Sequence, residues 1–427
     1  MSIKEIYEKF MQSSGVITDS RKAKKNCIFF SLKGPNFNGN KFAKNAVNNG
    51  ALIALVDEEK YALDNANYIY VKDCLETLQK LANFHRKKLK TKIIALTGSN
   101  GKTTTKELIN SVLKTKFKTS YTEGNLNNHI GVPLSLLKIT EETELAIIEM
   151  GANHIKEIES LCKITEPDFG YITNFGKAHL EGFGSEQGVV QGKSELYEFL
   201  IKKNGLIFYN SDDEKQIKIL SKYDNKFGFG KTNSDVKYQT KSVNPKIIIN
   251  VNQTDIKSSL FGNYNVENIV AAITIGLYFK LRIADIKNGI LNYISSNNRS
   301  QIINKEKNNI ILDAYNANPT SMMLAINNFE KLNVENKIFI LGDMFELGKD
   351  EIKFHQEIID YCENIKAKKI FIIGHIFSKT KFSKNFTSFD NYNELINMKE
   401  FKNITDSNFF IKGSRGIELE QIVDYIS

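Results

Sequence analysis

The residues of this chain with the clearest chemical meaning lie in one short glycine-containing segment. Residues 92–109, KIIALTGSNGKTTTKELI, predict an apolar strand, a turn and a helix that begins near Lys102. Gly98 and Gly101 let the backbone approach phosphate oxygens, and the free N–H groups at the helix start attract negative charge. Lys102 can reach the terminal phosphates, and the Thr103 hydroxyl can bind Mg²⁺. The segment therefore predicts a binding loop for a nucleoside triphosphate, made of Gly98, Ser99, Asn100, Gly101, Lys102, Thr103 and Thr104.

Two further polar residues end apolar runs close to this loop in the sequence. ELAIIEMG ends a predicted strand at Glu149, and FGYITN ends another at Asn174. Strand and helix patterns alternate here, which favours a mostly parallel sheet with helices on both faces. Ligands of such sheets bind beyond the carboxyl ends of the strands. We therefore expect Gly98, Glu149 and Asn174 to meet at one site.

The length of 427 residues favours two or three domains, because single cores seldom grow beyond ~250–300 residues. We expect a small α/β domain at residues 1–89, joined to the next by the basic helical segment LETLQKLANFHRKKLK. A central P-loop ATPase-type domain with a mostly parallel sheet should span 90–298, and a Rossmann-like domain 299–427. The apolar spacing of residues 417–426 predicts a final helix packed on the third sheet. The fold class is therefore α/β.

Composition excludes several classes of protein. The start of the chain is charged and no run approaches the roughly 18 apolar residues that cross a bilayer, so we expect a cytoplasmic protein without membrane insertion. The net charge of +9 comes from lysines spread along the whole chain, so we expect no nucleic-acid partner. The four cysteines lie far apart, which argues against disulfides or a zinc site: Cys27, Cys74, Cys162 and Cys362.

Nine stretches of the chain occur in an order that resembles the Mur ligases of bacterial cell-wall synthesis. They are TGSNGKTTTKE, GNLNNHIGVPLSLL, IIEMGANHIKEI, AHLEGFGS, QGKSE, NYNVENIVAAI, DAYNANPTSM, LGDMFELG and KGSRG. The resemblance covers essentially the whole chain. GNLNN, EMGANH and DAYNANP are most similar to the family members that join D-alanyl-D-alanine to UDP-N-acetylmuramoyl-tripeptide.

The resemblance implies a three-domain ligase that uses ATP and Mg²⁺ to form an amide bond for peptidoglycan synthesis, and we expect it to be a monomer. An acyl phosphate would turn a carboxylate oxygen into a leaving group, and such phosphoryl transfer depends mainly on positioning and charge neutralisation. The catalytic residues would be Lys102, Glu149, His179 and Lys193. By the same resemblance Thr103, Glu149, His179 and Lys193 hold Mg²⁺, with Lys193 converted by CO₂ into a carbamate. That reaction needs a neutral amine, hence a lowered pKa; a surface lysine is the alternative.

Three further residues resemble family contacts to ATP. Asn268 would contact the adenine, although a residue that opens an apolar helix can also be a cap. Arg299 would donate in a bidentate manner to the γ-phosphate and Asp313 would meet the ribose, once the third domain closes. An ordinary ion pair at the domain surface is the alternative for both.

The resemblance also implies contacts to the peptide substrate. The residues that would contact the UDP moiety or the rest of that substrate are Ser20, Arg21, Asn125, Asn127 and Asn128; turn formation is their alternative role. His129 and residues 37–42, FNGNKF, depart from the family pattern. These departures bear on the details of substrate contact and not on the reaction. A loop with Lys412, Ser414 and Arg415 could receive the dipeptide carboxylate or phosphates, or could be a simple glycine turn.

Two rival functions remain open from the sequence. A different Mur-type or folylpolyglutamate-type ligase would use another amine acceptor. A nucleotide-dependent switch or nucleic-acid-binding ATPase would also need the phosphate loop, but it gives Glu149, His179 and Lys193 no shared purpose.

Overall fold

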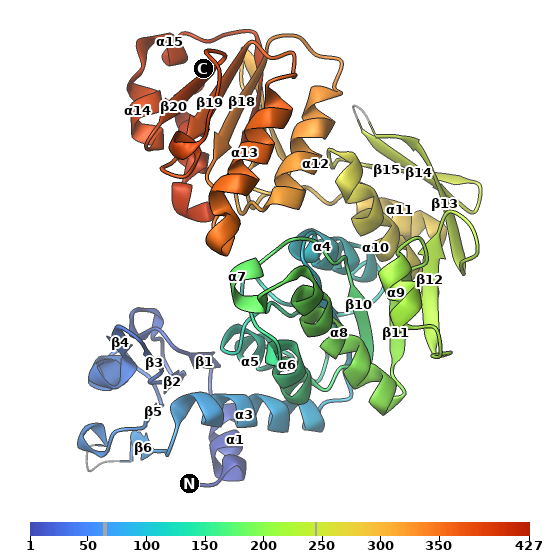
Figure 1. Ribbon diagram of the computed structural model, residues 1–427. Helices are drawn as coiled ribbons and strands as arrows, with labels where there is room; N and C mark the ends of the chain where they lie inside the picture. Colours follow the sequence, from blue (N-terminus) through green and yellow to red (C-terminus); the bar gives the residue numbers. More distant parts are fainter. Residues whose placement is uncertain (63–65, 244–245) are drawn as a thin grey trace.

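The computed structural model describes residues 1–62, 66–243 and 246–427, and their strands form three α/β layers along the chain (Figure 1). The first sheet (blue) and the third (orange to red) lie at opposite ends of the molecule, with the largest sheet between them. The predicted α/β class is confirmed. Within these residues no helix combines the length and the apolar character that crossing a bilayer requires.

The first sheet is small and parallel. Its strand order is β1-β2-β5-β6, formed by β1 (Val16–Ile17), β2 (Ile28–Phe30), β5 (Ile53–Val56) and β6 (Tyr68–Tyr70). A hairpin of β3 (Lys33–Gly34) and β4 (Phe37–Asn38) and the helices α1 (Ile3–Met11) and α2 (Ala43–Asn48) accompany it. The predicted connecting helix is α3 (Cys74–Lys88). Arg86 on this helix pairs with Asp168 at 2.8 Å, so α3 is anchored to the central part of the chain.

The central sheet has the order β15-β14-β13-β12-β11-β10-β7-β9-β8. From β8 to β13 it is parallel, as predicted, whereas β13, β14 and β15 are antiparallel, which the sequence did not indicate. The strands are β7 (Lys92–Thr97), β8 (Thr119–Tyr121), β9 (Leu145–Glu149), β10 (Phe169–Ile172), β11 (Leu206–Asn210), β12 (Lys226–Gly230), β13 (Val236–Ser242), β14 (Ile247–Val251) and β15 (Thr254–Ser258). Helices cover both faces: α4 (Lys102–Leu113), α5 (Gly131–Leu136), α6 (Glu157–Thr165), α7 (Leu180–Phe183), α8 (Glu186–Lys203), α9 (Glu214–Ile219), α10 (Val266–Tyr278) and α11 (Ile283–Leu291).

The third sheet has the order β16-β17-β21-β18-β19-β20, and only β16 runs antiparallel. Its strands are β16 (Gln301–Asn304), β17 (Asn308–Asp313), β18 (Lys337–Gly342), β19 (Lys369–Ile373), β20 (Phe386–Phe389) and β21 (Ser407–Lys412). Its helices are α12 (Pro319–Glu330), α13 (Glu351–Cys362), α14 (Tyr392–Asn397) and α15 (Lys399–Lys402). The predicted final helix is instead two short 3₁₀ segments, η7 (Arg415–Ile417) and η8 (Leu419–Tyr425), although Leu419 and Ile422 are buried as expected.

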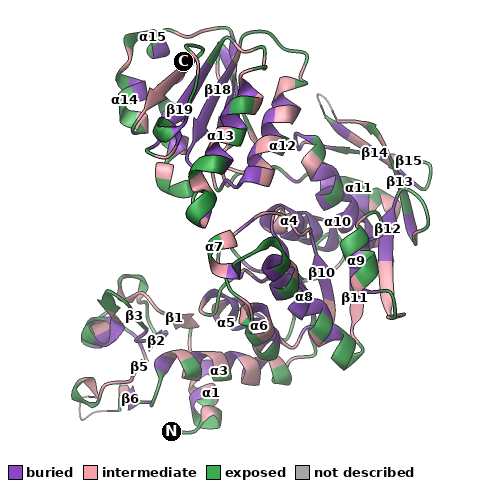
Figure 2. Cartoon of the chain, viewed as in Figure 1, coloured by how far each residue is buried: buried purple, intermediate pink, exposed green. Residues whose placement is uncertain are grey.

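Buried residues concentrate in the strands of the two larger sheets and in helices α4 and α10, as Figure 2 shows. One core lies on each face of the central sheet, and the third sheet is likewise packed on both faces. The four cysteines are free and buried, in agreement with the prediction of no disulfide framework. Rigid cores on both sides leave the carboxyl ends of the strands and their loops for function.

Candidate active site

The predicted phosphate loop has the geometry of an anion site. It joins β7 to α4, and Gly98 and Gly101 both have positive φ, 144° and 77°. A Cβ atom on Gly98 would lie 2.0 Å from Oγ1 of Thr173, and one on Gly101 would lie 2.4 Å from Oδ1 of Asn268, so only glycine fits at either position. No side chain caps the start of α4. The N–H groups of its first turn are therefore not occupied by a side-chain cap and can receive an anion.

The three strand ends that the sequence singled out meet at this loop, as predicted. β10, β7 and β9 are neighbours in the sheet. Asn174, just beyond β10, accepts a hydrogen bond from N–H of Asn100 on its Oδ1 at 3.1 Å, and its carbonyl accepts one from N–H of Ser99 at 3.0 Å. Glu149, at the end of β9, accepts a hydrogen bond from the Thr103 hydroxyl at 3.2 Å.

Glu149 is buried at the centre of the site, with 1% of its surface exposed. Its Oε1 accepts hydrogen bonds from Thr103 and from Nδ2 of Asn127, the latter at 2.8 Å. Oε2 lies 3.3 Å from Nζ of Lys106 and has no hydrogen-bond partner. Burial alone would raise the pKa of Glu149, but the ammonium groups of Lys106 and Lys102 outweigh it and hold the pKa below its usual range. A carboxylate oxygen kept ionised and left without a hydrogen bond suits a hard cation such as Mg²⁺.

Lys106 is a site residue that the sequence reasoning missed. Its side chain is fully buried, and besides Glu149 it meets the carbonyl of Gly124 at 3.3 Å. Lys106 stands one helical turn after Lys102, on the same face of α4. That spacing was the available signal. Together Lys106 and Asn127 tie the GNLNN loop, residues 124–128, to Glu149.

Lys102 is folded back onto its own loop. Its Nζ donates to the carbonyls of Gly98 at 2.7 Å and Ser99 at 3.2 Å. Burial lowers the pKa of Lys102 to about 8; the charge of Glu149 opposes this shift, and that of Arg299 adds to it. The side chain must leave these carbonyls to reach a terminal phosphate.

Lys193 is not a surface lysine. It lies on α8 with 1% of its surface exposed, its Nζ donates to the carbonyl of Ala152 at 2.9 Å, and it stands 4.9 Å from the centre of the Phe183 ring. Burial, reinforced by the charge of Lys102, holds the pKa of Lys193 well below its ordinary value. A lowered pKa is the condition that carbamate formation sets for this amine.

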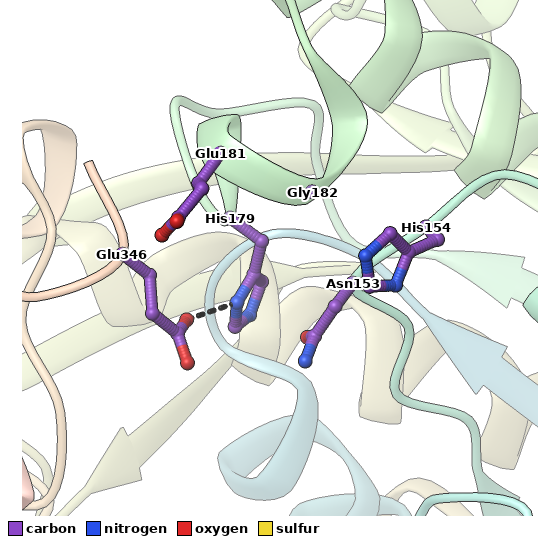
Figure 3. Close-up of a pocket in the computed structure, with 6 residues that line it drawn as sticks. All are labelled: Asn153, His154, His179, Glu181, Gly182 and Glu346. Atoms are coloured by element: carbon purple, nitrogen blue, oxygen red, sulfur yellow. Dashed lines mark ion pairs between the residues drawn. The ribbon is translucent and has the colours of Figure 1, made fainter. Parts of the chain in front are cut away.

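His179 lines a cavity of about 230 Å³ together with Asn153, His154, Glu181, Gly182 and Glu346. Figure 3 shows its ring between the carboxylate of Glu346 and the side chain of Asn153. Nδ1 of His179 forms an ion pair with Oε2 of Glu346, which belongs to the third part of the chain. Asn153 follows Ala152, the acceptor of Lys193, so the cavity adjoins the lysine. The structure shows no direct contact from His179 to Glu149 or Lys193 within the described residues.

The residues expected around ATP lie beside the loop. Asn268 is buried in the first turn of α10, accepts from the Thr105 hydroxyl at 3.0 Å and donates to Oδ1 of Asn265 at 2.9 Å, so it braces α4 and does not cap its own helix. Arg299 stacks 3.7 Å from the centre of the Tyr315 ring, and its buried Nε has no hydrogen-bond partner. The positive charge of Arg299 contributes to lowering the pKa of both Lys102 and Glu149.

Asp313 forms an ion pair, but it is a largely buried one and not the surface pair that the sequence left as the alternative. Its carboxylate accepts from Nζ of Lys412 at 2.6 Å and from N–H of Ser300 at 3.0 Å. Ser414 accepts a hydrogen bond from N–H of Phe345 at 3.0 Å. Lys412 and Ser414 are therefore both engaged inside the third domain. Arg415 lies 5.3 Å from the centre of the Tyr315 ring, on the same aromatic side chain as Arg299.

The residues expected at the peptide substrate have mixed roles. Ser20 and Arg21 lie on the 3₁₀ turn η1 (Ser20–Lys22), where the exposed Arg21 pairs with Asp19. Asn127 binds Glu149, as described above. Asn128 accepts from N–H of Ile130 and Gly131, which is the turn role, and Asn125 is exposed.

The third domain already touches the phosphate loop. Nδ2 of Asn318, the cap residue of α12, donates to Oδ1 of Asn100 at 2.7 Å, and the Thr320 hydroxyl accepts from N–H of Lys177 at 3.3 Å. A nucleotide on the loop would therefore lie against residues of two domains.

A phosphate loop flanked by two further α/β domains is the arrangement of the Mur ligases, and the chain belongs to this family. The description "Mur ligase family, catalytic domain" matches residues 12–86, "Mur ligase middle domain" matches 96–276, and "Mur ligase, glutamate ligase domain" matches 298–404. The three matches follow the three sheets.

Individual relatives match along nearly their whole length. The chain is 35% identical to the UDP-N-acetylmuramoyl-tripeptide–D-alanyl-D-alanine ligase of Bacillus subtilis, covering 96% of this chain and 92% of that protein. It is 32% identical to the enzyme of the same name from Haemophilus influenzae, covering 99% and 95%. A crystal structure of MurF from Acinetobacter baumannii has 30% identity and a TM-score of 0.85, covering 98% of this chain and 97% of that one.

Proposed function

We infer that this chain is an ATP-dependent ligase that joins D-alanyl-D-alanine to UDP-N-acetylmuramoyl-tripeptide in peptidoglycan precursor synthesis. Curated relatives of that name match it over nearly their full length. The structural observation that carries the inference is the contact of the phosphate loop with Glu149 through Thr103. It joins a triphosphate site to a buried carboxylate at neighbouring strand ends, which suits phosphoryl transfer.

The reaction has two steps. The terminal carboxylate of the tripeptide attacks the γ-phosphorus of ATP, the bond to the bridging oxygen of ADP breaks, and an acyl phosphate forms. The amino group of D-alanyl-D-alanine then adds to the acyl carbon, the tetrahedral intermediate loses phosphate, and the nitrogen loses a proton to give the amide. We propose that Lys102, the start of α4 and Arg299 neutralise the phosphate oxygens. They offer positive charge at the place where negative charge develops on those oxygens during phosphoryl transfer.

We propose that Asn268 and Asp313 support the nucleotide and that residues 1–89, 90–298 and 299–427 are the functional domains. Ser20, Arg21 and the asparagines at 125, 127 and 128 would meet the peptide substrate. All these groups come from one chain, so we expect a monomer to suffice. We propose that the reaction takes place in the cytoplasm, because it consumes ATP.

We propose that a magnesium ion would be held by Thr103, Glu149, His179 and a carbamate of Lys193. Bound Mg²⁺ would supply positive charge to the phosphate oxygens. Within the described residues no three side chains of His, Cys, Asp or Glu form a ready-made metal cluster. Mg²⁺ commonly takes only one or two carboxylates and completes its shell with water and substrate phosphates. A carbamate would add a second anionic ligand: the Nζ lone pair bonds to the carbon of CO₂ and one N–H proton leaves.

Lys193→Ala is expected to lower kcat by about 10²-fold or more, because it removes the anion that the carbamate would provide near the phosphates. Added acetate or formate should restore part of the rate, since a short carboxylate can enter the space left by the side chain. Phosphate release with and without these salts measures both effects. Full activity of the variant without added carboxylate would refute the modification.

The function itself is tested by phosphate release from ATP with purified substrates. Release is expected only when UDP-N-acetylmuramoyl-tripeptide and D-alanyl-D-alanine are both present, with the ligated pentapeptide identified by mass. Single amino acids should not replace the dipeptide, and glutamate with a folate should give nothing. Release that follows DNA, RNA or a single amino acid would assign the chain to one of the rival functions.

A further inference from the structure

The contact between His179 and Glu346 joins two domains. His179 precedes α7 in the central domain, whereas Glu346 lies in the LGDMFELG loop after β18 in the third domain. Both residues have positive φ, 53° and 62°, which non-glycine residues seldom adopt. The two residues that form this contact between domains thus both have an uncommon backbone conformation.

The loop that carries Glu346 is held firmly from inside the third domain. N–H of Met344 donates to Nε2 of His355 at 2.9 Å, and N–H of Phe345 donates to the Ser414 hydroxyl at 3.0 Å. His355 is fully buried, and the neighbouring Asp343 carboxylate accepts two backbone N–H groups at 2.8 and 2.9 Å. The position of the Glu346 backbone is therefore fixed by the third domain.

On the side of the central domain, the residues next to His179 are also held by packing. Leu180, next to His179, packs against the apolar core of the third domain, whereas Phe183 at the other end of α7 is part of the central core. The ring of Phe354 on α13 lies 5.7 Å from Nζ of Lys177. The short helix α7 therefore bridges the two domains around His179.

The contact uses one particular nitrogen of the imidazole. Oε2 of Glu346 lies against Nδ1, which forms no other contact with a hydrogen-bond partner among the described residues. A neutral ring with its proton on Nδ1 therefore keeps the lone pair of Nε2 free. Metal-binding histidines very commonly donate their second ring N–H to a carboxylate, which fixes the tautomer and orients the ring.

We propose that Glu346 is a positioning residue that the third domain supplies to the metal site: it holds His179 in the Nδ1–H form and directs Nε2 toward the metal. Docking of the third domain and completion of the metal site are then one event. The inference rests on the proposed function, because His179 has a metal to bind only if that function holds. It assigns a role to a glutamate that touches neither ATP nor the reacting atoms.

The test measures Mn²⁺ binding by electron paramagnetic resonance in the full-length protein with the non-hydrolysable analogue β,γ-methylene ATP. Glu346→Ala should weaken Mn²⁺ binding by about ten- to hundredfold, the usual loss when such a carboxylate is removed. The Mn²⁺ affinity of Glu346→Gln should lie between those of the wild type and Glu346→Ala, because the amide oxygen can still accept a hydrogen bond from Nδ1–H. The matched control is Asp350→Asn, which removes one exposed negative charge from the same segment and should bind Mn²⁺ as the wild type does.

Nitrogen-15 spectra of histidine-labelled protein at pH 8 provide a readout that a merely structural role would not move. The His179 signal, identified by its loss in His179→Gln, should report the Nδ1–H tautomer in the wild type. In Glu346→Ala it should shift toward the Nε2–H form that free imidazole favours. An unchanged tautomer, or unchanged Mn²⁺ binding with a raised KM for the dipeptide, would overturn the role of Glu346. A wild-type protein that binds no Mn²⁺ with the nucleotide would overturn the proposed metal site as well.

Discussion

Lys102→Met is expected to lower kcat/KM for ATP by about 10²–10³-fold, the cost of removing one preorganised donor at developing charge. The side chain already lies at the loop, bound to the carbonyls of Gly98 and Ser99, so it needs only a rotation to meet a phosphate. Methionine keeps the length and loses the charge. Steady-state phosphate release with both substrates measures the effect, and Lys106 must remain intact in the variant to keep Glu149 paired.

The same lysine gives a pH dependence. In the free protein burial lowers the pKa of Lys102 to about 8, and bound phosphate anions must raise it again. Binding therefore takes up a proton, so affinity for β,γ-methylene ATP is greatest below pH 8. It should weaken by about tenfold for each pH unit above that value. Calorimetry between pH 7 and 9.5 measures this slope, and Lys102→Met should abolish it. A wild-type affinity that is flat over this range would contradict the assignment.

The phosphate loop and the sheet around it were predictable because their signals are local. Gly98 and Gly101 are required by the backbone itself, and apolar runs closed by polar loops mark parallel strands. Glu149 and Asn174 follow from the same rule, since the ends of neighbouring parallel strands meet at one edge. These residues needed no knowledge of the packing.

The residues that were missed depend on packing between distant segments. In the sequence Lys106 is one lysine among many. Its role becomes visible only in the folded structure, where α4 packs beside β9 and the GNLNN loop. Glu346 belongs to a loop in the third domain, and only the docking of that domain brings it to His179. The antiparallel extension β13–β15 carries no chemical motif, so the sequence does not predict it. Spacing within one segment predicts elements, whereas a partner from another domain requires the assembled structure.

Glu149→Gln should both inactivate and destabilise the protein. Activity should fall by about 10²–10³-fold because the site loses the carboxylate that Thr103 contacts. The free energy of unfolding should fall by about 3–5 kcal/mol, because the ammonium of Lys106, with none of its side chain exposed, keeps no counterion. Urea unfolding measures the second effect. Glu142→Gln, the same change in an exposed pair with Lys118, should leave the free energy of unfolding nearly unchanged.

A double variant separates the two effects. Glu149→Gln combined with Lys106→Met removes both buried charges, so it should recover most of the lost stability, as buried ion pairs often tolerate neutral replacement. It should not recover activity, because the ionised oxygen beside the phosphate loop is still missing. A double variant as unstable as Glu149→Gln would show that the ion pair does not account for the loss. One with wild-type phosphate release would remove Glu149 from the reaction, and the remaining function of the carboxylate would be to neutralise Lys106.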